Sequence, residues 1–243
     1  MKKSILNTSA FRYIFEVIVI VFSVTLSFYM QDVLNKREKI ELKNKGLSGV
    51  LMELERDVFH FNLATRILKD RILMGQDFLN GKTTNENLNQ LMLTYSFAGN
   101  NSNYDSMVST GVIEFIGDKS ISREIVNYYE TNYSMLYDMS EQLKKIYFEF
   151  TFYMKKNYPI NSMFNITGEE SYESWSDLMN MTKFDYSEKT LKILNSDSEF
   201  RNHIYNIRKV KLYYIKFYED ALNFNQKLSH SIMEELKWTD RWI

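Results

Sequence analysis

Cysteine is absent from this chain of 243 residues, proline occurs once and glycine eight times. Without cysteine the chain has no disulfide framework, no thiol nucleophile and no cysteine-ligated metal site. Proline and glycine are the residues that most often interrupt helices and strands, so their scarcity predicts long unbroken elements. The net charge is only −1. The chain therefore lacks the overall positive field that is typical of a nucleic-acid-binding protein. We therefore expect no nucleic-acid partner.

Catalytic motifs are also missing. The chain has three scattered histidines: His60, His203 and His230. None of them has the spacing of a metal-binding pair. The glycines of Gly46–Gly49 are not followed by the Lys-Ser/Thr of a phosphate loop, and no Gly-x-Ser-x-Gly occurs. The adjacent acids Glu169–Glu170 and Glu234–Glu235 would point to different sides of a helix, and we predict that they are solvated. We expect a protein that is not an enzyme and that has no cofactor and no metal site.

One stretch, residues 12–31, is apolar enough to cross a membrane, because a span needs about 17–25 such residues. Its polar residues between the ends are Glu16, Ser23, Thr25 and Ser27. The basic start at Lys2–Lys3 also suits a signal peptide, but no small-residue cleavage pattern follows the run. No second run of spanning length occurs. We predict a retained single-pass transmembrane helix.

Three polar residues in this run are candidates for membrane anchoring or assembly. Glu16 lies one turn from Arg12 and can pair with it, although a carboxylate inside a span is unfavourable. Ser23 and Ser27 share one face, and small polar residues of this kind allow spans to associate. For Glu16 three roles stay open: an anchor at the membrane interface, a contact between helices, and a proton or ion path.

Beyond the run, the apolar positions recur every three or four residues, which is typical of amphipathic helices. Three long helices are expected: 47–79, ended by Asn80-Gly81; a helix capped by Asp118 or Ser120 that stops before Pro159; and a helix that starts near Ser196 or Asp197. Shorter helices are expected within 83–97 and near 171–181, around Trp175, with a loop at 98–105. Long helices that each bury one face pack against each other. The fold class is therefore predicted as all-α, an elongated antiparallel helical bundle continuous with the membrane helix.

The predicted divisions are an N-terminal tail (1–11), the span (12–31), a juxtamembrane helix (32–46) and the bundle (47–243). If the three long helices alternate in direction, the C-terminus lies far from the membrane. Trp238 and Trp242 would then either close that end of the bundle or bind a partner protein there. Tryptophan is also favoured at the headgroup region of a membrane.

Seventeen tyrosines are present, and eight of them form two groups: Tyr128, Tyr129, Tyr133 and Tyr137, then Tyr205, Tyr213, Tyr214 and Tyr218. Tyrosine buries its ring and keeps a polar tip, so it suits the edge of a core. We predict bundle packing with the hydroxyls at the edge. A pocket for a small ligand between the two tyrosine-rich helices is the alternative.

Several segments together resemble a known family. Phe15-Glu16-Val17 lies near the start of the apolar run, Gln31-Asp32 stands at its end, and the apolar patch after Gly111 leads to a helix with the pair Tyr128-Tyr129. This combination is similar to an uncharacterised family of single-span membrane proteins from Bacteroidota, a domain of unknown function. The chain departs from the family pattern in lacking a glycine before Glu16, in an inserted residue before Gly111, and in lacking a tryptophan after Gln31.

The resemblance implies a bacterial inner-membrane protein with its helical domain on the periplasmic side, and it brings no known activity. The count of basic residues on the two sides of the run slightly favours a cytoplasmic bundle instead. We expect the periplasmic side. The partners expected are the lipid bilayer and either another protein or a second copy. The predicted function is a non-enzymatic membrane-anchored scaffold or accessory subunit, and the alternative is a membrane-anchored sensor of a small ligand.

Overall fold

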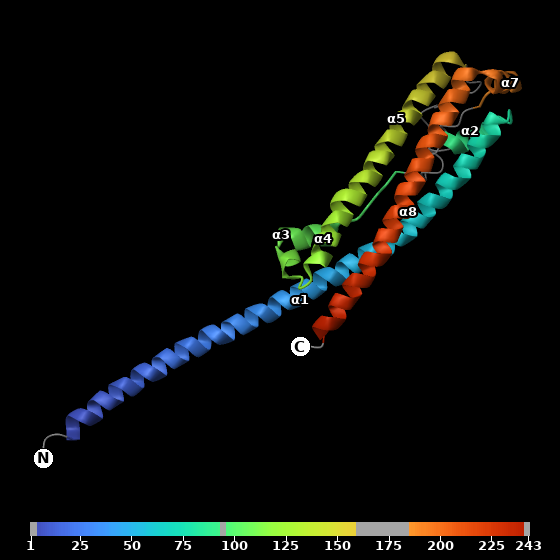
Figure 1. Cartoon of the computed structure of the whole chain (residues 1–243). Coiled ribbons are helices and arrows are strands. Elements are labelled where there is room, and N and C mark those ends of the chain that lie inside the picture. The colour runs from blue at the N-terminus through green and yellow to red at the C-terminus, as the bar shows by residue number, and fades with distance from the viewer. Residues whose placement is uncertain (1–3, 93–95, 159–184, 241–243) are drawn as a thin grey trace, which may run out of the picture.

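The computed structural model describes residues 4–92, 96–158 and 185–240 (Figure 1), and all regular structure in these ranges is helical. The elements are α1 (Ser4–Leu79), α2 (Asn85–Met92), α3 (Ser102–Ser109), the 3₁₀ helix η1 (Val112–Phe115), α4 (Lys119–Asn127), the π-helix η2 (Tyr128–Asn132), α5 (Tyr133–Asn157), α7 (Glu188–Ser196) and α8 (Ser198–Asp240). The predicted all-α fold with a long apolar N-terminal helix is confirmed.

Helix α1 runs without a break for 76 residues and has two different environments. From Phe11 to Leu42 its side chains are exposed apart from the half-buried Val33, and Lys43 is the first buried one. An 18-residue window near its start has a mean hydropathy of 2.0 and no buried residue, so it is not a core helix of the bundle. Figure 1 shows this N-terminal half extending alone beyond the bundle.

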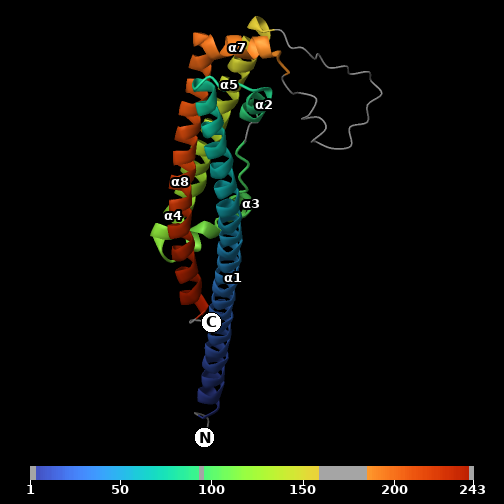
Figure 2. The same cartoon turned by 90° about the vertical axis from the view of Figure 1, so that its right-hand side faces the viewer.

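The long helices α1 and α8 pack side by side in opposite directions (Figures 1 and 2). Near the start of the bundle Lys43 of α1 pairs with Glu235, and at its far end Arg201 donates to the carbonyl of Leu79. Helix α5 is also antiparallel to α8, since the ring of Tyr153 near its C-terminal end lies 4.8 Å from that of His203. It follows that α1 and α5 are parallel.

The chain returns from the far end of α1 to the start of α3 without a long helix. After α2, residues 96–101 have no regular structure and run back along the bundle (Figure 1). The ring of Phe97 in this segment contacts Phe61 of α1 at 6.1 Å and Tyr133 at 5.0 Å. The predicted alternation of long helices is therefore wrong, because an extended segment makes the return. Helix α8 consequently ends beside the part of α1 that follows the apolar run, and not at the far end.

Several predicted boundaries agree with the structure. Gly81 has a φ of 76°, the left-handed conformation that ends a helix after Asn80. Asp118 caps α4 by accepting a hydrogen bond from the Ser120 amide at 2.8 Å, and α8 begins one residue after Asp197. The expected loop at 98–105 is wrong in its second half, which is helical from Ser102. Helix α7 was not expected, and the predicted helix near 171–181 with Trp175 lies outside the described residues.

One lysine of the described core has no hydrogen-bond acceptor for its buried amine. Lys211 of α8 is fully buried, and its Nζ has no hydrogen-bond partner among the residues that the structure describes. The amine lies 5.5 Å from the centre of the Tyr147 ring. Burial, and then the nearby charge of Arg71, hold the pKa of Lys211 well below its ordinary value. The folded chain therefore binds this proton less tightly than the unfolded chain does, which costs stability at neutral pH.

Replacing Lys211 by methionine should stabilise the protein, because a side chain of similar length fills the site without a charge to desolvate. The expected gain at pH 7 is on the order of 1–4 kcal/mol. It should shrink as the pH approaches 10.5, where the lysine of the unfolded chain also loses its proton. Thermal unfolding of the full chain in mild detergent, followed by circular dichroism, measures this. The matched control is Lys209→Met, which changes an exposed lysine of the same helix, and a loss of stability in Lys211→Met alone would contradict the prediction.

Candidate functional site

Two carboxylates lie on the buried face of α1, one turn apart. Glu53 and Asp57 are only 2% and 3% exposed, among apolar neighbours such as Val50, Leu54 and Phe61. Buried carboxylates are costly unless they receive hydrogen bonds or opposite charge. Their donors come from α3, from the π-helix, and from the first residue of α5. This tyrosine–carboxylate cluster is the most elaborate polar arrangement in the described core.

Asp57 receives two tyrosine hydroxyls on a single oxygen. Tyr128 donates to Asp57 Oδ2 at 2.7 Å, and Tyr133 donates to the same atom at 2.5 Å. From α8, the side-chain amide of Asn225 donates to the Tyr128 hydroxyl at 3.0 Å and to the carbonyl of Leu54 at 2.9 Å. The network therefore joins α1, α8 and the helix that begins at α4.

Glu53 has a different role, because it supplies a hydrogen-bond acceptor for the first turn of α3. Its Oε1 accepts the backbone amide of Asn103 at 2.7 Å and the hydroxyl of Ser102 at 3.2 Å. The N-cap residue Asn101 makes no capping hydrogen bond with its own side chain. A carboxylate from α1 thus satisfies a helix N-terminus, where negative charge is favoured. The other oxygen, Oε2, accepts the Tyr129 hydroxyl at 2.7 Å.

Close packing of α3 on α1 depends on two of the glycines of α1, Gly46 and Gly49. A Cβ atom added at Gly46 would lie 2.7 Å from Cγ of Met107, and one added at Gly49 would meet Asn103 at a still shorter distance. These two glycines do not belong to a phosphate-loop motif. Their lack of a side chain lets α1 and α3 approach each other closely.

A π-helical turn explains why three tyrosines reach these carboxylates. In a regular α-helix, Tyr128, Tyr129 and Tyr133 would spread over too wide an arc to face one partner helix. The wider turn at Tyr128–Asn132 shifts the register by one residue, so that Tyr133 is buried whereas Asn132 is only half-buried. Such π-bulges in long helices often occur at functional positions. A regular helix would instead place Asn132, four residues after Tyr128, on the buried face.

The predicted position of the tyrosine hydroxyls at the edge of the core is wrong for most of the two groups. The hydroxyls of Tyr128, Tyr129 and Tyr133 point inward to carboxylates, and Tyr214 and Tyr218 are fully buried, with their hydroxyls 3.0 Å apart. The members at the surface are Tyr137, Tyr205 and Tyr213. Since the hydroxyls of Tyr128, Tyr129 and Tyr133 donate their protons to carboxylates of the protein, they offer little to a ligand.

Burial alters the titration of the cluster. Desolvation raises the pKa of Asp57 to about 6, and the hydrogen bonds from Tyr133 and Tyr128 lower it only in part. Desolvation and the neighbouring carboxylates raise the pKa of all three tyrosines far above the ordinary value. Near neutral pH the tyrosines are therefore fixed donors, whereas the charge of Asp57 can change.

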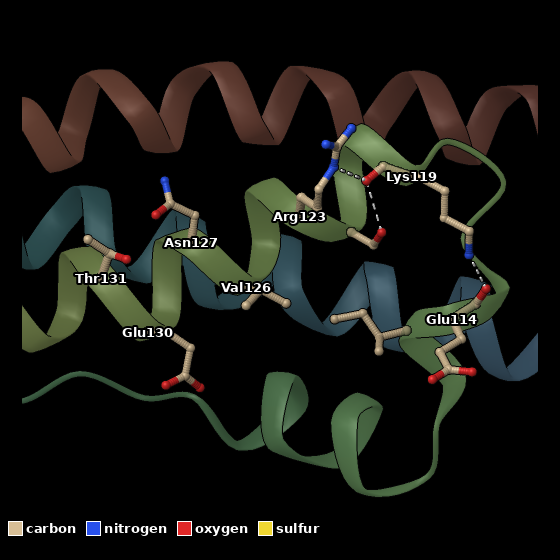
Figure 3. A pocket seen from close by; sticks show the side chains of 9 residues that line it. Glu114, Lys119, Arg123, Val126, Asn127, Glu130 and Thr131 are labelled. Atoms are coloured by element: carbon tan, nitrogen blue, oxygen red, sulfur yellow. Dashed lines mark hydrogen bonds between the residues drawn. The ribbon is translucent and has the colours of Figure 1, made fainter.

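Two surface hollows flank the cluster. One, of about 480 Å³, lies between η1 and α4 (Figure 3). Its lining includes Glu130, whose Oε1 accepts the Tyr104 hydroxyl at 2.8 Å, and Lys119, which donates to the backbone of Glu114 at 2.5 Å. Two acids, Glu114 and Glu130, and two bases, Lys119 and Arg123, line it, so its charge favours neither an anion nor a cation. The other, of about 400 Å³, is lined by Phe97, Tyr129, Tyr133 and Tyr137 among others.

The predicted residues of the apolar run lie far from this cluster. Glu16 Oε1 is 3.1 Å from Nε of Arg12, so the pairing of these two side chains is present. Ser23 donates to the carbonyl of Val19 at 2.7 Å, within its own helix. Ser23 and Ser27 are exposed, as is every described side chain from Phe11 to Gln31.

The backbone of Trp238 belongs to α8, whereas its side chain and all of Trp242 lie outside the described residues. The predicted solvation of Glu234–Glu235 is wrong for one of the two. Glu234 pairs with Lys237 at the surface, but Glu235 is nearly buried and lies 2.8 Å from Nζ of Lys43.

No family model matches the chain, and no curated protein or solved structure matches it. The cluster has the geometry of a structural centre, because each of its carboxylates and hydroxyls is buried and hydrogen-bonded within the protein. The sequence carries only a weak signal for it. Glu53 and Asp57 stand at helical spacing beside buried apolar residues, but charged residues on a helix are normally assigned to its solvated face.

Changing Asp57 to asparagine should alter how stability depends on pH. A carboxyl whose pKa is raised in the folded state stabilises the fold while it is protonated, and this contribution is lost as the pH rises through about 6. Asparagine keeps an oxygen for the tyrosines and has no charge to bury. Relative to the wild type, Asp57→Asn should therefore gain on the order of 2 kcal/mol between pH 4 and pH 8.

Thermal unfolding of both full chains at pH 4 and pH 8 measures this difference. Asp70→Asn, at an exposed position of the same helix, should show no such gain. An equal effect of the two substitutions would contradict the assigned role of Asp57.

Proposed function

We propose that this chain is a non-enzymatic scaffold, anchored in a membrane by the apolar run of α1, which holds a rigid helical bundle for another protein to bind. The observation that carries this proposal is the continuity of α1. One helix contains both the exposed apolar window and residues of the bundle core such as Leu54 and Leu68. Without a flexible linker, the membrane segment sets the direction of the bundle. From Gln31 to Leu79 the helix extends about 70 Å.

The outer face of α5 is the surface that best suits a protein partner. Phe148 and Phe152 are 73% and 62% exposed. Each lies two positions from the buried Phe150, which places them on the side of the helix that faces away from the core. Tyr137, three turns earlier, is 56% exposed on the same side. Exposed aromatic residues gathered on one face are typical of binding surfaces.

The tyrosine–carboxylate cluster supports this proposal by making the bundle stiff. Hydrogen bonds from Tyr128, Tyr129 and Tyr133 connect α1 to the helix that presents the outer face of α5. Buried polar networks that are fully satisfied specify one arrangement of the elements around them. A partner bound to α5 is therefore connected to the membrane helix through these hydrogen bonds.

We place the protein in a bacterial inner membrane with the bundle on the periplasmic side. This placement is supported by the resemblance of the first 60 residues to the Bacteroidota family. The number of basic residues after the span opposes it, because it favours a cytoplasmic bundle. A reporter enzyme that is active only outside the cytoplasm, fused to the C-terminus, should be active in cells. Activity of the same reporter fused before Lys2, with none at the C-terminus, would reverse the orientation.

Site-specific photocrosslinking tests the partner surface. Benzoylphenylalanine placed at Phe148 or at Phe152 should give the same adduct in native membranes, of the mass of this chain plus one partner. Placed at Phe59, which is equally exposed on α1, it should not give this adduct. Substituting serine at both α5 positions should abolish the complex in mild detergent without changing the melting temperature. Equal adducts at all three positions would contradict a specific surface on α5.

A further inference from the structure

One face of α1 carries large apolar side chains that no described element covers. Successive residues of an α-helix are rotated by about 100°, so the direction of a side chain follows from its residue number. Leu34 points in the same direction as Met52, five turns later, and Phe59 differs from them by only about 20°. The three residues are 59%, 65% and 67% exposed. They therefore form one exposed line along the helix.

The bundle packs on the other side of α1. From Lys43 to Leu68, every buried residue of this helix lies about 100° or more from the direction of Met52. Asp57 and Phe61, which belong to the core, are nearly opposite to it. The exposed line is thus directed away from the helices that surround the core.

The same direction continues into the apolar run. Ser23 and Ser27 lie within about 20° of Met52, and both are exposed. Ser23 donates its hydroxyl proton to the carbonyl of Val19 in the same helix, so its small side chain can lie against a second helix without an unsatisfied donor. We define the α1 strip by the residues of this line: Ser23, Ser27, Leu34, Met52 and Phe59.

The length of the α1 strip indicates what kind of molecule can cover it. From Ser23 to Phe59 it extends roughly 50 Å and passes from the apolar run to the bundle without a break. Lipid can cover only its first part. A matching occupant is a helix that also crosses the membrane and continues straight out of it, and α1 of a second copy has this form.

Two copies in one membrane enter it in the same direction, so their α1 helices are parallel. The two-fold axis of such a pair is parallel to both helices. Each residue then lies at the level of its own counterpart, and the two edges of the α1 strip are exchanged between the copies. The left edge of one strip therefore meets the right edge of the other.

The charges along these edges are complementary in that arrangement. Arg37, Glu41 and Glu55 lie about 20–60° to one side of Met52, and residues of opposite charge lie about 20–40° to the other side. The pairs expected across the interface, at similar levels, are Arg37 with Glu38, Glu41 with Lys45, and Glu55 with Arg56. All six side chains are exposed, and none forms an ion pair with another described residue.

We propose that the α1 strip is the interface of a parallel, two-fold symmetric dimer of this chain. Leu34, Met52 and Phe59 contact their own counterparts, Ser23 and Ser27 let the two spans approach, and the charged edges fix the register. This inference rests on the proposed membrane anchor, because the membrane makes the two helices parallel. The proposed partner surface belongs to α5 and not to this strip, so the dimer presents that surface twice.

Disulfide crosslinking tests the dimer, since the chain has no cysteine of its own. Leu34→Cys and Met52→Cys are made one at a time in the full chain, and native membranes are treated with copper–phenanthroline. Both variants should give a product of two chain masses, because a disulfide needs Cα atoms less than about 7 Å apart. The matched control is Ile40→Cys, an exposed position of the same helix about 120° from the strip. It should give little of this product. Equal crosslinking at all three positions, or none at Leu34 and Met52, would overturn the proposal.

Reversing charges at the edges tests the register. In the Met52→Cys chain, Glu55→Arg places like charges opposite each other, and symmetry makes this contact twice. The initial crosslinking rate should fall on the order of fivefold. Adding Arg56→Glu should restore it. Neighbours in sequence do not face each other on a helix, so this rescue reports a contact between two copies. A double variant that stays as slow as Glu55→Arg would contradict the proposed pairing.

Two further measurements separate this proposal from those on which it depends. Benzoylphenylalanine at Phe59 should give a product of two chain masses, and a product that contains a different protein would overturn the dimer. The same membranes are extracted at alkaline pH. Release of the wild-type chain would refute the anchor, whereas a retained chain without crosslinking at the α1 strip would refute the dimer alone.

Discussion

The need of two buried carboxylates for hydrogen-bond donors constrains the arrangement of this bundle. Glu53 and Asp57 lie in an apolar environment, where an unpaired charge would cost several kcal/mol. Glu53 is satisfied by the first turn of α3 and by Tyr129, and Asp57 by Tyr128 and Tyr133. These requirements determine where α3 sits, why the helix after α4 contains a π-turn, and which face of that helix meets α1.

The extended return between α2 and α3 has consequences for both ends of the molecule. It brings α3, η1 and α4 to the part of α1 that follows the apolar run, and it makes α5 parallel to α1. Helix α8 then runs back and ends beside Lys43. Among the described residues, the far end of the bundle is therefore formed by the ends of α1 and α5, by α7 and by the start of α8, and the other end of α8 lies on the side of the apolar run.

The three features that bear on function belong to one mechanical arrangement. The unbroken α1 connects the apolar run to the bundle, the tyrosine–carboxylate cluster connects α1 to α5, and α5 presents Phe148 and Phe152 outward. The hollow between η1 and α4 carries charges of both signs, and the hollow beside Tyr129 and Tyr133 is lined mainly by aromatic and polar residues. This arrangement suits the proposed role, in which the bundle holds a partner at a defined distance and angle from the membrane.

Local sequence was sufficient for the features that depend on neighbouring residues. The apolar run, the ends of the long helices at Gly81 and Asp118, and the all-α class all follow from helical periodicity and capping, which act within a few positions. Tyr128 and Tyr129 were recognised as unusual, but their role was not, because their partners lie 71 and 76 residues away.

Tertiary structure alone decided the burial of Glu53 and Asp57, the π-turn, the direction of α5 and the place where α8 ends. Each of these depends on which distant segment supplies a hydrogen bond or covers an apolar face. An amphipathic pattern shows that a helix buries one side, but it does not state the partner or its direction. An isolated stretch also cannot show that an acidic residue is buried, because its cost is offset only by donors elsewhere in the chain.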